Sequence, residues 1–122
     1  MNRSRCILLI GLFSLISYRA VPQVSFAGDQ LRSEFNRGME FFEKEKYAAA
    51  IKQFEGYIKN SDKTDKHSVD EAEYFSALSS LYLFNPVAEY KIAAFINTHP
   101  ESPRINEAYL ALADYFYQNK NY

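Results

Sequence analysis

Few side chains in this sequence could take part in acid–base or metal chemistry. The two histidines, His67 and His99, fall in links between apolar segments, the first among charged residues and the second directly before Pro100. In these positions they are expected to be solvated loop residues rather than metal ligands or catalytic bases. Asp70 and Glu73 are spaced to share one helical face, but no apolar pocket or second partner accompanies them. They are therefore interpreted as a solvated surface and not as an acid/base pair.

The motifs that usually announce an enzyme are missing from the sequence. There is no glycine-rich phosphate loop, no H-E-x-x-H, no Cys/His metal spacing and no nucleophile elbow. The single cysteine, Cys6, lies at the start of the N-terminal apolar run and is badly placed to carry a lipid. We expect no catalytic residue, no metal site and no cofactor.

Charge argues against nucleic-acid binding. The chain has 14 basic and 15 acidic residues, and three of the basic ones, Arg3, Arg5 and Arg19, lie before Ala27. All of the acidic residues follow Ala27, so the remainder is net acidic and has no basic cluster for a phosphate backbone.

The first 27 residues have the plan of a secretory signal peptide. Arg3 and Arg5 precede an uncharged run from Cys6 to Ser17, and a more polar stretch leads to the small residues Ser25 and Ala27. The run is shorter than the roughly 20 apolar residues of a membrane-spanning helix. Residues 1–27 are therefore predicted to be cleaved, with an uncleaved N-terminal anchor as the alternative.

Apolar residues recur at helical spacing through the rest of the chain, and no strand-like alternation competes with them. Helix-start signals support this pattern: "SVDE" from Ser68 resembles a capping box, Asn85 and Ser102 each precede a proline, and Asp29 could cap the first helix. Five helices are predicted, near residues 30–44, 47–60, 69–83, 86–98 and 103–118.

The helical pattern repeats. A shift of 38 residues places Ala50 on Ala88 and Phe54 on Ile92, and the phrase "GMEFFEKEKY" from Gly38 returns as "ADYFYQNKNY" from Ala113. Small residues at these positions would let paired helices approach closely, and the aromatic residues would fill the space between successive pairs.

This repeat resembles the tetratricopeptide repeat, a hairpin of two antiparallel helices. The matching residues in the three units are Gly38, Phe41, Ala50 and Phe54; Phe75, Ala88, Ile92 and Pro100; and Tyr109, Leu112, Ala113 and Phe116. Glu34, Arg37, Ser76, Ser79 and Asp62 depart from the pattern. The segment from Phe95 to Tyr122 looks most like units of exported Gram-negative envelope proteins, such as the outer-membrane assembly lipoproteins and periplasmic cell-division coordinators.

The resemblance implies an all-α fold for residues 28–122: an α-solenoid of stacked antiparallel hairpins, with about two and a half repeats. The hairpins would be residues 30–60 and 69–98, followed by the first helix of a third at 103–118. The second helix of that third unit is missing, which we interpret as a longer array cut short. An unrelated helical bundle with a chance period is the alternative.

The resemblance also implies a function. Stacked hairpins form a concave groove that receives an extended peptide or a partner helix, so the chain is expected to be a non-catalytic protein–protein interaction scaffold of the bacterial cell envelope. It would lie in the periplasm or at the periplasmic side of the outer membrane, associating with that membrane through its partners. The groove-facing residues would be Arg32, Phe35, Met39, Phe42 and Glu43; Asp70, Glu73, Ala77, Ser80 and Leu81; and Glu107, Leu110, Asp114 and Tyr117.

Such a face would suit a partner with large apolar side chains flanked by Lys or Arg. Phe35, Met39 and Phe42 have core packing as their alternative role. Two other functions remain open: a docking module of a larger enzyme or sensor whose active domain lies beyond Tyr122, and self-association through the open C-terminal end.

Overall fold

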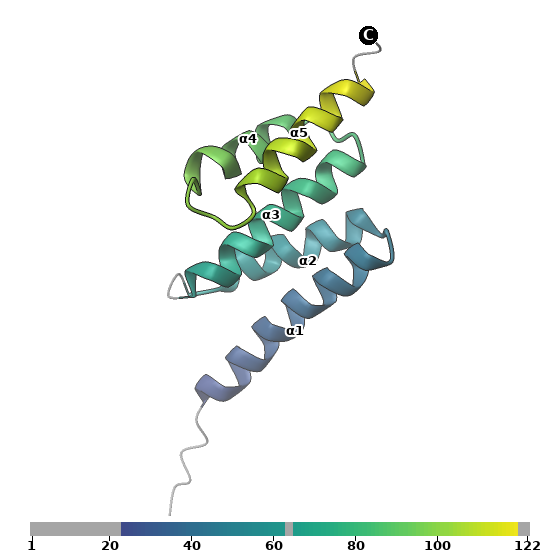
Figure 1. Ribbon diagram of the computed structural model, residues 1–122. Coiled ribbons are helices and arrows are strands. Elements are labelled where there is room, and N and C mark those ends of the chain that lie inside the picture. Colours follow the sequence, from purple (N-terminus) through teal and green to yellow (C-terminus); the bar gives the residue numbers. More distant parts are fainter. Residues whose placement is uncertain (1–22, 63–64, 120–122) are drawn as a thin grey trace, which may run out of the picture.

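The computed structural model describes residues 23–62 and 65–119 of the 122-residue chain, and these residues form five helices and no strand. The helices are α1 (Gln23–Glu43), α2 (Tyr47–Asn60), α3 (Lys66–Tyr82), α4 (Ala88–Thr98) and α5 (Ile105–Asn119) (Figure 1). The predicted all-α fold is confirmed for this part of the chain. None of its helices is long and apolar enough to cross a membrane.

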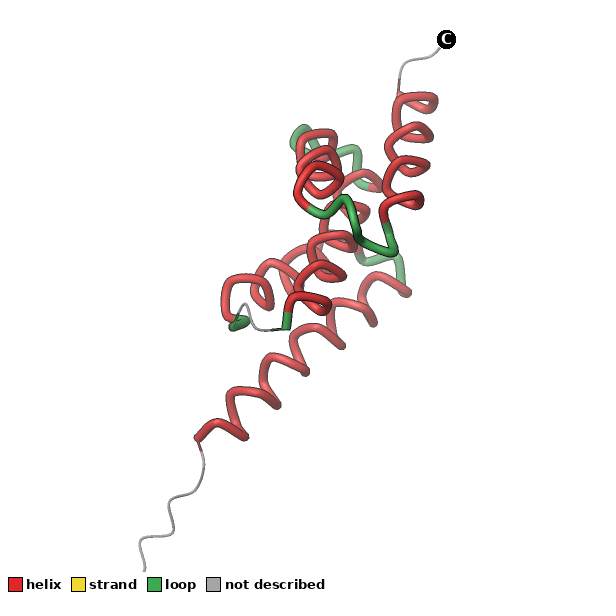
Figure 2. Tube along the Cα trace, turned by 60° about the vertical axis from the view of Figure 1, so that its left-hand side comes forward, coloured by secondary structure: helices red, strands yellow, loops and turns green. Residues whose placement is uncertain are grey.

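Consecutive helices pack against each other along the chain. In addition, α3 contacts both α1 and α5, whereas α1 has no close backbone contact with α4 or α5 within the described residues. Figure 1 shows α1 at the lower end and α4 and α5 at the upper end, with α2 and α3 between them. Figure 2 shows the same order from another side. The middle helix α3 therefore carries packing from both directions.

The core is centred on α3. Every residue from Tyr74 to Leu81 is buried, including three serines, while α2 and α4 each bury only one face. Ala50 and Phe54 of α2 and Ala88 and Ile92 of α4 are fully buried. Since apolar surface is removed from water on both sides of α3, this helix has no solvent-facing stripe over its C-terminal half.

Aromatic rings connect the first hairpin to α3. The Phe54 ring stacks on Phe75 at a centroid distance of 5.9 Å, and Phe35 and Phe42 approach these two rings edge-on at 5.8 and 5.0 Å respectively. Gly38 makes this packing feasible, because a Cβ built there would lie 2.6 Å from Phe54 Cε1. The prediction that Gly38 permits close approach of the first two helices is confirmed.

Two predicted helix starts are wrong. Helix α1 begins at Gln23 and not near residue 30, so Asp29 lies inside it and is not its cap. Helix α3 begins at Lys66, capped by Asp65, whose carboxylate accepts bonds from the Ser68 hydroxyl at 2.7 Å and the Ser68 backbone N–H at 3.3 Å. The bond from the hydroxyl, and to a smaller extent the bond from the backbone N–H, holds the pKa of Asp65 below its ordinary value. Ser68 is thus a donor within the first turn and not the cap of a capping box.

The later helices also begin two residues beyond their predicted starts. Asn85 Oδ1 accepts a bond from the Val87 N–H at 3.2 Å, and Ser102 Oγ accepts one from the Arg104 N–H at 3.2 Å. Both side chains therefore bond the chain just ahead of a helix, as capping residues do, but the prolines lie in the preceding turns.

The predicted signal peptide lies largely outside the described residues. Residues 1–22, including Cys6, fall there, and α1 begins at Gln23, ahead of the expected cleavage site after Ala27. Cleavage therefore stays a prediction.

Candidate functional site

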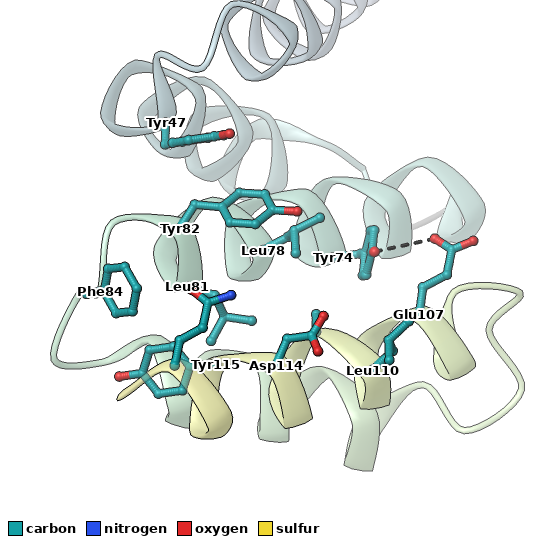
Figure 3. Close-up of a pocket in the computed structure, with 12 residues that line it drawn as sticks. Tyr47, Tyr74, Leu78, Leu81, Tyr82, Phe84, Glu107, Leu110, Asp114 and Tyr115 are labelled. Carbon is teal, nitrogen blue, oxygen red and sulfur yellow. Dashed lines mark hydrogen bonds between the residues drawn. The ribbon is translucent and has the colours of Figure 1, made fainter. Parts of the chain in front are cut away.

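A groove lies between α3 and α5 (Figure 3). Its volume is about 440 Å³, within the range of roughly 300–1,000 Å³ that is usual for ligand sites. We call it the α3–α5 groove; it is lined by Tyr47, Tyr74, Leu78, Leu81, Tyr82, Phe84, Glu107, Leu110, Ala111, Asp114, Tyr115 and Gln118.

The middle of the groove is apolar and partly open to solvent. Leu78 and Leu81 are buried in its α3 wall, whereas Leu110 on α5 is 63% exposed. Such a combination of a firm apolar floor and an accessible apolar rim is typical of a surface that another molecule covers. Figure 3 shows these leucines on the two facing helices.

Aromatic pairs border the end of the groove near the C-terminus of α3. The rings of Tyr47 and Tyr82 lie 4.9 Å apart, and Phe84 stacks on Tyr115 at 5.9 Å. Phe84 has a positive φ of 50°, a left-handed conformation that is uncommon for a bulky residue. The turn after α3 therefore directs this ring toward α5, and the ring contact fixes the distance between the two helices at this end.

The opposite end is polar, and its lining residue Glu107 is bonded by Arg104, which does not itself line the groove. Its guanidinium bonds Glu71 of α3 through Nε at 2.9 Å and Nη2 at 3.0 Å, and Glu107 of α5 through Nη1 at 2.8 Å. It also lies over the rings of Tyr74 and Phe75, 5.5 and 5.4 Å from their centroids. A bidentate pair combined with ring stacking is specific to arginine. Arg104 therefore ties α5 to α3.

The neighbouring phenol belongs to the same network. The Tyr74 hydroxyl donates to Glu107 Oε2 at 3.3 Å. Burial, with the adjacent Glu107 carboxylate adding to it, raises the pKa of Tyr74 to about 12. Hydrogen bonds to Glu71 and Glu107 raise the pKa of Arg104 in turn. At neutral pH the phenol is therefore a hydrogen-bond donor and the arginine a fixed cation.

The charged side chains that line the groove are two carboxylates, Glu107 and Asp114, and no basic residue lines it. Glu107 is already paired with Arg104. Asp114 is exposed and has no hydrogen bond or ion pair with any other described residue. In Figure 3 its side chain extends from α5 into the space between the two helices.

The structure places four of the predicted groove-facing residues in this groove: Leu81, Glu107, Leu110 and Asp114. Tyr117, also on α5, is 75% exposed and lies outside the lining of the groove.

The predicted face of α3 is displaced by about one residue. Ala77 and Ser80 are 2% and 0% exposed, so the prediction that they face a partner is wrong. Tyr74 and Leu78 line the groove instead of Glu73 and Ala77. The whole segment around them is small or apolar and buried, and its periodicity gives no firm phase for the helix.

The predicted face of α1 does not line the groove. Phe35, Met39 and Phe42 are partly buried against the core, which is the alternative role expected for them. Arg32 and Glu43 are exposed on the same helix. Arg32 borders a second hollow of about 400 Å³, between the N-terminal part of α1 and the end of α2.

His99 is not a solvated loop residue, and that prediction is wrong. Its side chain is only 13% exposed and lies between two carboxylates: Nδ1 is 3.1 Å from Asp70 Oδ1, and Nε2 makes a short contact with Glu73. The Nε2 contact with Glu73 is a hydrogen bond, whereas Nδ1 makes no hydrogen bond with the described residues and lies only near the Asp70 carboxylate. Asp70 and Glu73 therefore link the end of α4 to α3, and neither lines the α3–α5 groove.

The His99 contacts do not form a metal site. The two ring nitrogens point to carboxylates on different sides of the imidazole, so these oxygens do not converge on one point. Across the described residues, no group of three or more His, Cys, Asp or Glu side chains could hold a metal ion.

Sequence reasoning missed Arg104 and the aromatic residues Tyr47, Tyr74, Tyr82 and Phe84. Nothing in the sequence near Arg104 indicates its role, because its partner Glu71 is distant in sequence. The exposed aromatic residues at the end of the third predicted helix were the available clue.

Comparison with known proteins identified no relative: no family model matches the chain, and no curated protein or solved structure matches it.

Proposed function

We propose that this chain is a helical-repeat scaffold of the tetratricopeptide type that binds a segment of a partner protein in the α3–α5 groove and catalyses no reaction. The observation that carries the proposal is the groove itself, an open and largely apolar space between two helices that occupy corresponding places in successive hairpins. Grooves of this kind are suited to an extended peptide or an amphipathic helix.

The order of helix contacts supports a stacked arrangement. α3 packs on the α1–α2 hairpin, and α5 packs on α3 and α4. Lys91 of α4 also forms an ion pair of 2.5 Å with Glu55 of α2, which joins the second helices of successive hairpins. Neighbour-to-neighbour packing is the property that defines a solenoid.

Export to the bacterial periplasm is part of the proposal and is supported by the sequence of residues 1–27. The scaffold would there hold an envelope protein, and its own association with the outer membrane would be indirect.

Two aspartate substitutions on the same helix test the groove. Leu110 lines it and Tyr117 does not, although both side chains are more than half exposed. Leu110→Asp is expected to abolish recovery of specific partners from an envelope fraction, and Tyr117→Asp is expected to preserve it, with both variants retaining the wild-type circular dichroism spectrum. Equal recovery by the two variants would show that the groove is not the working surface.

A further inference from the structure

One carboxylate in the α3–α5 groove has no counter-charge. Arg104 neutralises Glu107 at the polar end, with its nitrogens directed to Glu71 and Glu107. Asp114 lies further along α5, makes no hydrogen bond or ion pair with the other described residues, and extends into the groove. The groove therefore has uncompensated negative charge near its middle.

The surroundings of Asp114 favour a cation that also carries apolar atoms. Tyr74 and Tyr82 present aromatic rings on α3 across the groove from Asp114, and Leu78 lies between them as an apolar floor (Figure 3). Aromatic faces attract ammonium and guanidinium groups, and the aliphatic stems of lysine and arginine cover apolar surface well.

We propose that the α3–α5 groove recognises a lysine or arginine side chain, carried between large apolar side chains of a partner protein, and that Asp114 is its counter-charge. This inference rests on the proposed function, namely that the groove is a docking surface. Arginine fits best, because its planar guanidinium can bond a carboxylate with two N–H groups while its face lies on a tyrosine ring.

Other kinds of partner fit less well. An acidic segment would meet Asp114 and Glu107, no basic residue lines the groove, and the Arg104 nitrogens are already bonded to Glu71 and Glu107. A purely apolar segment would cover Asp114 and remove it from water without giving it a partner, which opposes binding.

The test uses the full chain and a panel of synthetic peptides. Each peptide has about seven residues, with leucine and phenylalanine on both sides of a central arginine, citrulline or glutamate; citrulline keeps the shape of arginine but has no charge. Binding is measured by fluorescence anisotropy for the wild type, Asp114→Asn and Glu89→Gln. Glu89 is an exposed carboxylate on α4 that does not line the groove, and its substitution removes the same charge.

For the wild type, the arginine peptide is expected to bind about five- to tenfold more tightly than the citrulline peptide, and the glutamate peptide most weakly. In Asp114→Asn the advantage of arginine over citrulline should fall below about twofold, whereas Glu89→Gln should behave as wild type. Higher salt should weaken arginine binding selectively, because an exposed ion pair is screened.

The possible failures are distinguishable. Equal binding of the arginine and citrulline peptides, tighter binding of the glutamate peptide, or no binding of the panel would overturn the cation subsite. If Leu110→Asp weakened all the peptides while Asp114→Asn changed nothing, the groove would remain a docking surface without charge recognition. Peptide binding that neither substitution affects would lie outside the groove and would also contradict the proposed function.

Discussion

Replacing Gly38 with alanine should destabilise the protein, although alanine is the better helix former. In an exposed helix the exchange of glycine for alanine raises the free energy of unfolding by about 0.5–1 kcal/mol. At Gly38, however, the new Cβ would lie 2.6 Å from Cε1 and 2.8 Å from Cδ1 of Phe54. The normal separation of carbon atoms in contact is about 3.5–4.0 Å, so helix and ring must move apart by about 1 Å.

The Phe54 ring cannot give way easily. It is 0% exposed, and Phe35 and Phe75 lie 5.8 and 5.9 Å from it. Overpacking at such a site costs about 1–3 kcal/mol, which outweighs the gain in helix propensity. Gly38→Ala is therefore expected to lower the free energy of unfolding by about 1–2 kcal/mol and the Tm by roughly 5–15 °C.

Gly56 offers a matched control on the partner helix. A Cβ there would meet only Glu34, at 3.7 Å, which is an ordinary contact. Gly56→Ala should therefore raise stability by about 0.5–1 kcal/mol. Urea unfolding followed by circular dichroism would measure both variants. Because the clash is with one ring, Phe54→Leu should cost less stability in the Gly38→Ala protein than in the wild type. Stabilisation by Gly38→Ala similar to that of Gly56→Ala would refute the reasoning.

Three further predictions concern the contacts that join α3 to its neighbours. Burial raises the pKa of Tyr74 to about 12 from its ordinary 10.0, so the stability that its neutral phenol contributes is complete below about pH 10 and is lost as the pH rises toward 12. The free energy of unfolding, measured in urea across this range, should fall more steeply for the wild type than for Tyr74→Phe. Equal slopes would contradict this. Arg104→Met should lower the free energy of unfolding by about 1–3 kcal/mol, since it leaves two carboxylates without their cation. Arg104→Lys should recover only part of this lost stability, because lysine cannot make the bidentate pair. Full recovery in a thermal melt would show that charge alone matters. His99→Ala should cost about 1–3 kcal/mol, because it removes the hydrogen-bond partner of Glu73 and the ring that lies between the two carboxylates. The exposed His67→Ala should change stability by less than about 0.5 kcal/mol. Indistinguishable denaturation midpoints would mean that the buried contact does not stabilise the fold.

The sequence allowed the helices to be located more securely than they could be oriented. Residues 47–60 were predicted as a helix and α2 has these bounds, because Ala50, Phe54 and Tyr57 form one clear apolar face. Residues 103–118 were likewise close to α5. Periodicity identifies a helix well when one side faces solvent and the other faces the core.

The same signal fails where every residue along a stretch of helix is buried. Along α3 the stretch "YFSALSSL" is buried throughout, so apolar and small residues do not alternate with polar ones. The predicted face was consequently displaced, and Tyr74 and Leu78 were missed as lining residues. For α5, which keeps an exposed side, Glu107, Leu110 and Asp114 were assigned to the groove from sequence.

Polar contacts between residues distant in sequence could not be predicted either. His99 was expected in solvent because it precedes a proline in a turn, but the turn folds back over the start of α3 and brings Asp70 and Glu73 to its ring. Local sequence describes the turn and gives no information on what packs over it.

The burial of the α3 stretch from Tyr74 to Leu81 has a consequence for how this protein can vary over generations. Each side chain from Tyr74 to Leu81 is at most 9% exposed, so a larger residue in place of one of the serines would have to displace packed neighbours. Substitutions should accumulate on α1 and α5 while this octet changes slowly. In any set of orthologues, α3 would be the stretch by which distant members are recognised.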